Sequence, residues 1–584
     1  MNNRKYKDAL YDPRPLRDLR DLIKSSRRLY GSKPAFLVKK DHEQPFQPIS
    51  YIRWDAEVDA MGTAFCNLGL KGKKIAVTGE NSYKWVVSYM ATTNGTGVIV
   101  PIDRELKPLE IANLLNRAEV SAIVHSQKMK KVIKKVLPLL DKPLEVVINM
   151  DAEDDDEDGT LSWDRLLEKG KEAVAAGDRT FIDAEIDPER MCSLLFTSGT
   201  TGMAKGVMLS HKSIASNVYA TAKYVDVLDY VGLSVLPMHH SYEMSCHIFM
   251  GLFMGFTCAI CEGLRYIIKN MQEAHVSIML AVPLIYENMH KKIMQNAKKT
   301  GQYKKLRMMI AISKKLKLYN NQKLIRKLFK PIHELTGNHI IQFIAGGAAM
   351  DPKVAEDFEA MGFPFIQGYG MTENSPIISV NRDRYAKQTS AGQPLVGTEV
   401  KVIDQDEDGI GEICLRGPSI MIGYYDDPEE TAKVLTEDGW LKTGDYGYLD
   451  DEGYIYISGR KKNVIITKNG KNVFPEEIEF YLEQSDFIEE TLVHGVPDDR
   501  GDTVIKAEVV PAYNEIEMQL GDLDEDEIHD LINEEIDKAN ELMPLYKKVR
   551  RFAIRKEEFT KTTTRKIKRH TAENMNNDRG EDVK

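Results

Sequence analysis

Residues 194–211 read LLFTSGTTGMAKGVMLSH. Leu194, Leu195 and Phe196 are typical of the end of a buried strand, and a dense alternation of hydroxyl side chains and glycines follows them. Glycine lets the backbone approach a ligand closely and turn its N–H groups toward it. The hydroxyls add donors, and Lys205 adds a charge suited to phosphate. The stretch predicts a loop that grips a polyphosphate; the alternative is an ordinary Gly/Thr turn between two strands.

This loop is not a P-loop of the G-x-x-x-x-G-K-[ST] type, because the spacing differs and Gly206 follows Lys205. Outward from it, short apolar runs alternate with longer helical patterns, which indicates a parallel α/β architecture. The predicted strands are 75–78, 98–102, 122–125, 146–149, 233–237, 258–260, 277–282 and 340–345.

From about residue 398 the strands become closely spaced, with Gly and Asp turns between them, and predict a small β-rich subdomain. After Arg460, a hairpin with an Asn469-Gly470 turn and a helix opened by Pro475 begin an α+β unit. We predict a large N-terminal α/β domain at 1–459, with the β-rich subdomain at about 398–459. A small mobile C-terminal domain at 460–570 and a flexible tail at 571–584 complete the prediction.

Length and composition narrow the class of protein. A chain of 584 residues predicts two or more domains. The net charge of −10 argues against nucleic-acid binding. Six cysteines scattered through apolar runs are typical of buried thiols in a reducing compartment. The start is charged, and the longest apolar run, 248–261, is shorter than the ~20 residues that cross a bilayer. We expect a cytoplasmic protein.

One stretch departs from the acidic average. Residues 291–330 contain fourteen Lys and Arg and no Asp or Glu. They are either a pair of solvated helices or a patch that meets anionic lipid headgroups or an acidic partner. Each basic residue at an anionic lipid surface contributes up to about 1 kcal/mol. An apolar face would come from Met308, Met309, Ile310, Ile312 and Leu316.

Four further motifs follow the loop in order. They are QGYGMTE (367–373), KTGD (442–445), SGRKK (458–462) and FTKTTTRKIKR (559–569). In this order and spacing they resemble the adenylate-forming enzymes, which include acyl-CoA synthetases, peptide-synthetase adenylation domains and luciferases. The resemblance covers about 48–570. LPMHHSYE (236–243), AGGAAM (345–350) and the basic stretch look most like long-chain fatty acyl-CoA synthetases.

The resemblance implies that the chain activates a carboxylic acid with ATP, releases pyrophosphate, and passes the acyl group from acyl-AMP to coenzyme A. It assigns the β- and γ-phosphates to Thr197, Ser198, Gly199, Thr200, Thr201, Gly202 and Lys205. Glu373 would hold Mg²⁺, a hard cation that prefers oxygen ligands, and Thr372 would meet the α-phosphate. Gly346, Gly347, Ala348, Tyr369 and Gly370 would line the adenine slot.

The residues expected to bind ribose, to form the hinge and to meet coenzyme A lie after residue 440. By resemblance, Asp445 would accept the two ribose hydroxyls, a task suited to a carboxylate, and Arg460 would reach ribose or phosphate. Lys462 matches the hinge about which the small domain rotates in this family. One orientation serves adenylation, and another presents the hairpin near Gly470 to the coenzyme A arm.

Lys566 is the residue that the resemblance sends into the site, to neutralise charge on the attacking carboxylate and the α-phosphate. The same motif holds three alternative cations, Lys561, Lys568 and Arg569. Two features depart from the family pattern. Ala204 stands where the phosphate loop often has proline, and Thr560 and Arg565 replace the proline and glycine of the terminal P-K-T-x-x-G-K.

The acid itself is predicted from one apolar region. His239, His240 and Tyr242 stand where the family narrows the path between acyl pocket and thiol tunnel. Gly251 and Gly255 would leave room for an alkyl chain, against the alternative of plain core packing. We expect a long-chain fatty acid–CoA ligase. The alternatives are an acyl-ACP synthetase or fatty acyl-AMP ligase, a medium-chain or aromatic acid–CoA ligase, a non-catalytic nucleotide-binding regulator, and a membrane-associated scaffold.

Overall fold

The structure is a computed structural model that describes residues 11–197, 204–224, 230–382, 386–466, 471–498, 503–562, 567–569, 571, 574 and 581–583. The chain divides into two compact units. The first comprises Met1–Glu399, Leu415–Leu441 and Glu452–Tyr454; the second comprises Val400–Cys414, Lys442–Asp451 and Ile455–Lys584. The predicted boundaries at residues 459 and 570 remain predictions. Within the described part of the chain, no helix has the length and apolar character to cross a membrane.

One sheet of the first unit carries the ends of the phosphate loop. Its order is β19 (Gly423–Tyr424), β9 (Lys205–Ser210), β8 (Met191–Thr197), β4 (Val98–Pro101), β3 (Lys74–Thr78), β5 (Ala122–His125), β6 (Val146–Asn149) and β7 (Leu161–Ser162). The strands from β8 through β4, β3 and β5 to β7 are parallel, whereas β9 is antiparallel to β8 and to β19. Ile111 and Leu115 of α4 (Pro108–Ala118) and Ile133 of α5 (Lys130–Val136) are buried with its strands.

The second sheet of this unit has nine strands. Its order is β16 (Gln393–Pro394), β15 (Ile377–Val380), β14 (Phe365–Gly370), β13 (Gln342–Gly346), β12 (Ile278–Ala281), β10 (Val231–Ser234), β11 (Thr257–Ile260), β1 (Pro34–Val38) and β2 (Gln47–Ser50). From β14 to β1 every pairing is parallel. The predicted parallel α/β class is therefore confirmed, and every predicted strand of this region has its counterpart in one of the two sheets.

Local sequence signals begin several of the helices. Ser50, Ser82 and Ser162 each accept a hydrogen bond from a backbone N–H in the first turn of the helix that follows them. The remaining helices of the first unit are α1 (Leu19–Tyr30), α2 (Tyr51–Asn67), α3 (Tyr83–Ala91), α6 (Trp163–Ala175), α7 (His211–Ala222), α8 (Met250–Phe253), α9 (Ile267–Glu273), α10 (Pro283–Lys299), α11 (Tyr303–Leu316), α12 (Gln322–Leu328), α13 (Lys330–Leu335), α14 (Pro352–Ala360) and α15 (Pro428–Val434). Two segments are π-helical, η1 (Thr92–Thr96) and η4 (Tyr242–Phe249).

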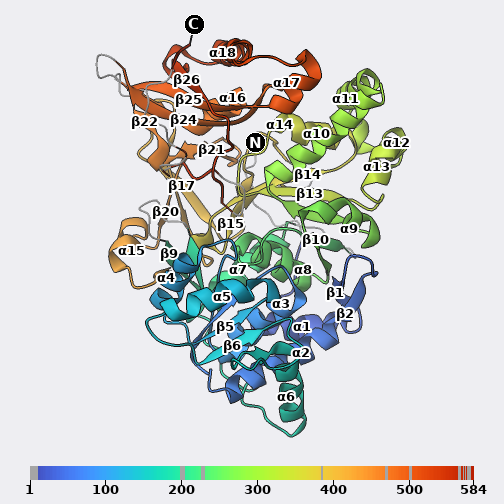
Figure 1. Cartoon of the computed structure of the whole chain (residues 1–584), viewed down its shortest axis with the longest axis vertical. Helices are drawn as coiled ribbons and strands as arrows, with labels where there is room; N and C mark the ends of the chain where they lie inside the picture. The colour runs from blue at the N-terminus through green and yellow to red at the C-terminus, as the bar shows by residue number, and fades with distance from the viewer. Residues whose placement is uncertain are drawn as a thin grey trace. The chain divides into compact units, whose positions relative to one another are not determined.

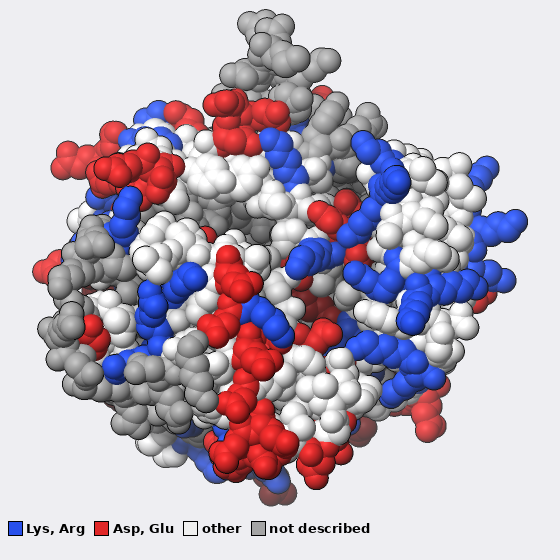
Figure 2. All heavy atoms as spheres, turned by 90° about the horizontal axis from the view of Figure 1, so that it is seen from above, with Lys and Arg blue, Asp and Glu red and all other residues white. Residues whose placement is uncertain are grey.

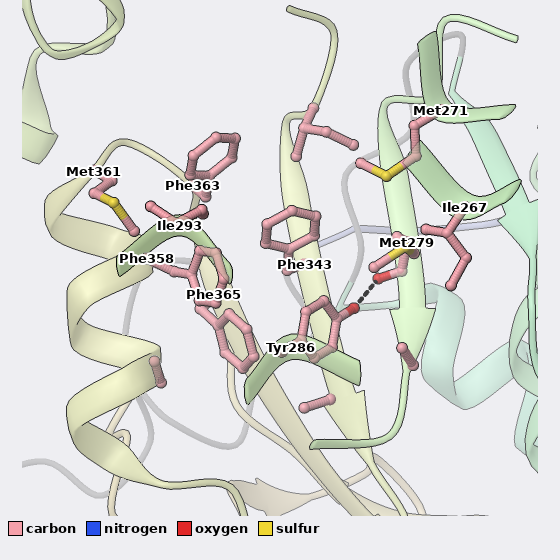
Figure 3. Packing of buried hydrophobic residues seen from close by; sticks show 14 of the residues in the cluster. Ile267, Met271, Met279, Tyr286, Ile293, Phe343, Phe358, Met361, Phe363 and Phe365 are labelled. Carbon is pink, nitrogen blue, oxygen red and sulfur yellow. Dashed lines mark hydrogen bonds between the residues drawn. The ribbon is translucent and has the colours of Figure 1, made fainter. Parts of the chain in front are cut away.

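An aromatic core fixes α10 and α14 against β12, β13 and β14 (Figure 3). Tyr286 of α10 donates to the carbonyl of Met279 at 2.7 Å, and its ring lies 5.1 Å from Phe343 and 5.0 Å from Phe365. A buried tyrosine hydroxyl needs such a partner, so this bond satisfies it. The start of α10 is thereby held in place, and α11, α12 and α13 follow it beside the same sheet (Figure 1).

The second unit contains a four-stranded sheet, β17 (Glu399–Ile403), β18 (Gly411–Arg416), β20 (Leu441–Leu449) and β21 (Ile455–Arg460), and a short hairpin, β22 (Ile465–Ile466) with β23 (Asn472–Val473). A further sheet orders β24 (Ile488–Pro497), β25 (Thr503–Pro511), β26 (Arg551–Ile554) and β27 (Glu581–Asp582). Its helices are α16 (Pro475–Leu482), α17 (Tyr513–Leu520) and α18 (Glu525–Glu541). Sequence patterns missed β20, β24 and α17. They also predicted a flexible tail at 571–584, within which β27 pairs with β26.

Candidate active site

The predicted adenine and metal residues lie at one edge of the nine-stranded sheet. Gly346 at the end of β13 is opposite Gly368 of β14, and the two strands are parallel. Gly347 and Ala348 therefore leave β13 on the same side as Thr372 and Glu373 leave β14. In open parallel sheets, ligands bind beyond the carboxyl ends of the strands.

Glycine is required at two positions of this edge. Gly347 has φ of 88°, in the left-handed region that few other residues adopt. A Cβ on Gly370 would lie 2.3 Å from the carbonyl oxygen of Pro376, so no larger residue fits. Tyr369, beside Gly370 on β14, is opposite Ser379 of β15. The backbone at this edge can therefore come close to a flat ligand.

The segment with His239, His240 and Tyr242 reaches the same edge. A Cβ on Gly346 would lie 2.9 Å from the Tyr242 hydroxyl, so the tyrosine ring packs directly on that glycine. The Oγ of Ser241 lies 3.5 Å from Oγ1 of Thr372. Among the described residues nothing hydrogen-bonds the buried Tyr242 hydroxyl. Burial also raises the pKa of Tyr242 well above its usual value, so the hydroxyl stays protonated and can donate to a ligand.

The phosphate loop is reached from β8 and β9. Thr197 ends β8 opposite Lys205, which begins β9, and its hydroxyl donates to the Lys205 carbonyl at 3.4 Å. The intervening candidates Ser198, Gly199, Thr200, Thr201 and Gly202 lie outside the described residues. The hairpin therefore places the two described ends of the predicted loop side by side.

Tyr424, which no sequence motif indicated, contacts both Lys205, the phosphate candidate, and Glu373, the metal candidate. The Lys205 ammonium lies 4.8 Å from the centre of the Tyr424 ring, and the Tyr424 hydroxyl donates to Oε1 of Glu373 at 2.8 Å. Burial, then the charge of Glu373, raises the pKa of Tyr424, which stays a donor. Tyr424 reaches this place because β19 pairs with β9. The motifs gave no signal for it.

Lys205 already has a carboxylate partner. Its Nζ lies 2.5 Å from Oε2 of Glu430, at the start of α15. Hydrogen bonds from Lys205 and then Lys433 lower the pKa of Glu430 to about 2. The carboxylate is therefore ionised at any pH near neutral. It holds the lysine in position and is the group that a phosphate would have to replace.

The surroundings of Glu373 fit a magnesium ion. Tyr424 occupies Oε1, and among the described residues no donor binds Oε2. Mg²⁺ is typically held by one or two carboxylates together with substrate phosphates and water. Within the same described part of the chain, no group of three or more His, Cys, Asp or Glu is arranged to bind a metal. A magnesium ion at Glu373 would depend on the nucleotide phosphates, and its binding remains a proposal.

His239 is largely buried, and its Nε2 lies 3.6 Å from a carboxylate oxygen of Asp103. Its Nε2 is buried and, among the described residues, has no hydrogen-bond partner. Burial, then the charge of Arg104, lowers the pKa of His239 to about 3, so the imidazole is neutral. The ring lies 4.2 Å from that of His240, and both line a cavity of about 10 Å³ with apolar side chains from β8, β9 and α3. That volume holds one water molecule.

The predicted room for an alkyl chain at Gly251 and Gly255 is wrong. A Cβ on Gly251 would lie 3.1 Å from the Phe256 ring, and one on Gly255 would lie 2.6 Å from the Tyr30 ring. Aromatic side chains therefore fill the space, and plain core packing is the correct interpretation of these glycines.

In the second unit, the two ribose candidates meet. Asp445 of β20 and Arg460 of β21 are directly opposite, and Nε of Arg460 lies 2.7 Å from Oδ1 of Asp445. The Asp445 side chain is 4% exposed, whereas that of Arg460 is 45% exposed. A ribose would therefore meet a carboxylate already oriented by arginine. Lys462, the predicted hinge, lies in the short helix η8 (Lys461–Asn463) directly after β21.

Lys566 and Gly470 lie outside the described residues. The structure nevertheless accounts for two of the alternatives to Lys566. Lys561 contacts the carboxylates of Glu490 and Glu558, and Arg569 contacts that of Glu479. These two cations serve the packing of the second unit, which leaves Lys566 and Lys568 as the candidates within the motif.

Comparison with solved structures identifies the fold. The anthranilate CoA ligase AuaEII in complex with anthranoyl-AMP matches with a TM-score of 0.73 at 20% identity, over 97% of each chain. ATP-bound MatB from Rhodopseudomonas palustris matches with a TM-score of 0.70 at 23% identity, over 93% of this chain and 96% of that one. The chain has the fold of adenylate-forming enzymes.

Comparison of sequences gives the family. Residues 25–425 match the AMP-binding enzyme family, and residues 462–581 match the AMP-binding enzyme C-terminal domain. The chain belongs to the AMP-binding enzyme family, which confirms the resemblance seen in the motifs. A chloroplastic long-chain-fatty-acid–[acyl-carrier-protein] ligase of Arabidopsis thaliana is 27% identical over 81% of this chain and 74% of its own. Long-chain-fatty-acid–CoA ligase 5 of Rattus norvegicus is 30% identical over 77% and 70%.

Proposed function

We propose that this protein activates a long-chain fatty acid with ATP, forming acyl-AMP and pyrophosphate, and transfers the acyl group to coenzyme A. The observation that carries the proposal is the row from Lys205 through Tyr424 to Glu373. It supports a single site with a cation for phosphates and a carboxylate for a metal. Thr372, which adjoins Glu373 in the chain, is the candidate donor to the α-phosphate.

The chemistry explains why these groups are needed. A carboxylate is a poor electrophile, and its attack on the α-phosphate concentrates negative charge in the transition state. Lys205 would exchange Glu430 for the β- and γ-phosphates, and Thr372 would hold the α-phosphate for attack. When bound at Glu373, Mg²⁺ supplies positive charge against the phosphate oxygens. Asp445 would orient the ribose.

The lining of the small cavity favours an uncharged acyl tail. Its walls include Leu195, Leu209, Ile214, Met238 and Met244, and no Lys or Arg is among the residues that line it. An acid with a second carboxylate would find no counter-charge there. The cavity of about 10 Å³ would have to enlarge for an alkyl chain, and methionine side chains repack readily because they are unbranched.

The acceptor has a second candidate. The Arabidopsis relative is named as a ligase for acyl-carrier protein, which favours a carrier protein as the alternative to coenzyme A. The adenylation half of the reaction is common to both acceptors.

Pyrophosphate release tests the proposal. Acids from acetate to stearate, with benzoate as the aromatic member, are supplied with ATP and magnesium, each with coenzyme A, with acyl-carrier protein, or with neither. We expect the highest kcat/KM for the long saturated acids with coenzyme A, and no release from Glu373→Gln. Turnover confined to short or aromatic acids would exclude the long-chain assignment, and no turnover on any acid would exclude the enzyme.

A further inference from the structure

Two helices of the basic stretch expose apolar side chains in regular rows. On α11, Met308, Ile312 and Leu316 are 57%, 42% and 62% exposed. They are spaced four residues apart, so they form one line along the helix. On α12, Leu324 and Leu328 are 46% and 36% exposed with the same spacing. Exposed aliphatic rows of this kind are uncommon on a surface that meets only water.

Lysines flank these rows. They are Lys304, Lys305 and Lys315 on α11, Lys317 at its C-terminal end, and Lys323 and Lys327 on α12. Among the described residues none of these lysines pairs with a carboxylate, whereas Arg307 and Lys314 lie 3.0 Å and 2.8 Å from Asp357 of α14. The basic stretch therefore contains inner cations that hold the helix to α14 and outer cations that face away.

The outer sides of both helices face away from one core. Leu306 and Ile310 of α11 are buried in the same apolar cluster as Ile325 of α12 and the adjoining Phe329. Lys and Arg side chains gather on the right-hand side of Figure 2, the side on which α10 to α13 lie in Figure 1. We call the exposed apolar and lysine side chains of α11 and α12, with Lys317, the basic–apolar surface.

Helix stability explains Lys314 and Lys315 in the last turn of α11 but not Lys304 and Lys305 in its first turn. Its first turn holds Lys304 and Lys305 and no acid, and the side chain of Gln302 makes no cap. A helix N-terminus carries partial positive charge and is stabilised by acids, so lysines there are unfavourable. The two first-turn lysines therefore weaken the helix on its own, and an anionic partner outside the chain would offset that cost.

We propose that the basic–apolar surface docks the protein on an anionic lipid bilayer. Amphipathic helices lie in the interface when their apolar side chains enter the headgroup–acyl boundary and their lysines meet lipid phosphates. A bilayer satisfies both halves of the pattern. A nucleic acid would match the lysines but would leave the exposed aliphatic rows without a partner, and an acidic protein is the alternative that the test below distinguishes. The proposal does not depend on which acid is activated.

Vesicle co-sedimentation of the full chain tests this proposal. Phosphatidylcholine vesicles are compared with vesicles that also contain phosphatidylglycerol. We expect at least tenfold tighter binding to the anionic vesicles, weakened by salt. Lys304→Gln/Lys315→Gln/Lys327→Gln should lower that affinity at least tenfold. The control Lys128→Gln/Lys131→Gln/Lys135→Gln, which removes the same charge at η2 (Gln127–Met129) and α5, should lower it less than twofold.

The apolar rows are tested separately. Met308→Ser/Ile312→Ser should weaken anionic-vesicle binding about fivefold, and the equally exposed pair Leu109→Ser/Leu139→Ser should not. Pyrophosphate release without lipid should be unchanged in all four variants, which shows that they fold. The proposal is overturned if the unchanged protein does not bind anionic vesicles. It is also overturned if control and test variants lose affinity equally, or if only an acidic polypeptide is bound.

Discussion

Two lysine–glutamate pairs have nearly the same nitrogen–oxygen distance but differ in how deeply they are buried. In the first unit, Lys205 and Glu430 lie 2.5 Å apart, with side chains 20% and 26% exposed. In the second unit, Lys506 and Glu508 lie 2.7 Å apart on β25, with side chains 0% and 1% exposed. A buried charge that loses its partner is strongly destabilising, whereas an accessible pair contributes little and can be exchanged. Burial therefore distinguishes a cation committed to the fold from one that a ligand can recruit.

The same distinction applies to the motif at 559–569. Lys561 and Arg569 have side chains 14% and 18% exposed and contact carboxylates that are about as buried. Like Lys506, they are largely buried cations whose carboxylate partners hold them in the fold. A cation of this motif that acts on the nucleotide should therefore be sought among the remaining lysines.

The largest effect is expected from Lys566→Ala. If Lys566 neutralises the α-phosphate in the transition state, acyl-AMP formation should fall about 10²–10³-fold, the size of a lost electrostatic contact at a reacting centre. Thioester formation from supplied acyl-AMP should change by less than about threefold if, as we propose, that step uses a different orientation of the small domain. Pyrophosphate release and thioester assays measure the two halves.

Lys568→Ala is the matched control, since it removes an exposed lysine of the same motif. It should leave both half-reactions near their original rates. Equal losses in the two variants would contradict the assignment of Lys566.

Lys506→Met tests whether the buried Lys506–Glu508 pair is needed for the stability of the fold. The substitution leaves Glu508 buried with only His494, whose Nε2 lies 3.5 Å from Oε1 of Glu508, and it should lower the free energy of unfolding by about 3 kcal/mol. The double variant Lys506→Met/Glu508→Leu should recover most of that loss, because it removes both charges. Urea denaturation of the single and double variants measures the difference. A double variant no more stable than the single one would argue against the pair as the cause.

Lys205→Ala tests whether the accessible Lys205 binds ATP rather than stabilising the fold. We expect the KM for ATP to rise about tenfold, equivalent to about 1.4 kcal/mol of lost binding. The free energy of unfolding should change by less than about 1 kcal/mol, because the pair is accessible. Steady-state kinetics and thermal unfolding on one preparation separate the two effects. A large loss of stability with an unchanged KM would show that Lys205, like Lys506, stabilises the fold and does not bind ATP.

The smallest effect is expected from Glu430→Gln. Removal of the competing carboxylate should lower the KM for ATP about two- to threefold, and Glu429→Gln, an exposed neighbour on α15, should not. Because its lysine partners lower the pKa of Glu430 to about 2, the carboxylate is charged at any working pH. The gain should therefore be the same from about pH 6 to pH 9. An unchanged KM would show that Glu430 does not compete with the phosphates.

Local sequence patterns predicted much of the fold. Apolar runs located strands of both parallel sheets. They failed where tertiary pairing outweighs local preference. β24, with the sequence IEETLVHGVP, has no clean alternation of apolar and polar residues, and it becomes a strand because β25 pairs along its length.

The candidate site divides in the same way. The motifs brought forward Gly346, Thr372, Glu373, Asp445 and Arg460, because each chemical task restricts the residue type that can perform it. They could not supply Tyr424 or Glu430, which reach Lys205 only because β19 pairs with β9 across more than two hundred residues.

By itself, the sequence determined the family, the parallel α/β class and the chemical types at the site, since these depend on residue identity and short-range periodicity. Only the tertiary structure decided which cations are already paired and which are not. It placed Lys205 against an accessible carboxylate, buried Lys506, paired Lys314 of α11 with Asp357, and left the other lysines of α11 and α12 facing outward. The physical reason is that the effect of a charge depends on its burial and its neighbours, and both arise from chain segments distant in sequence.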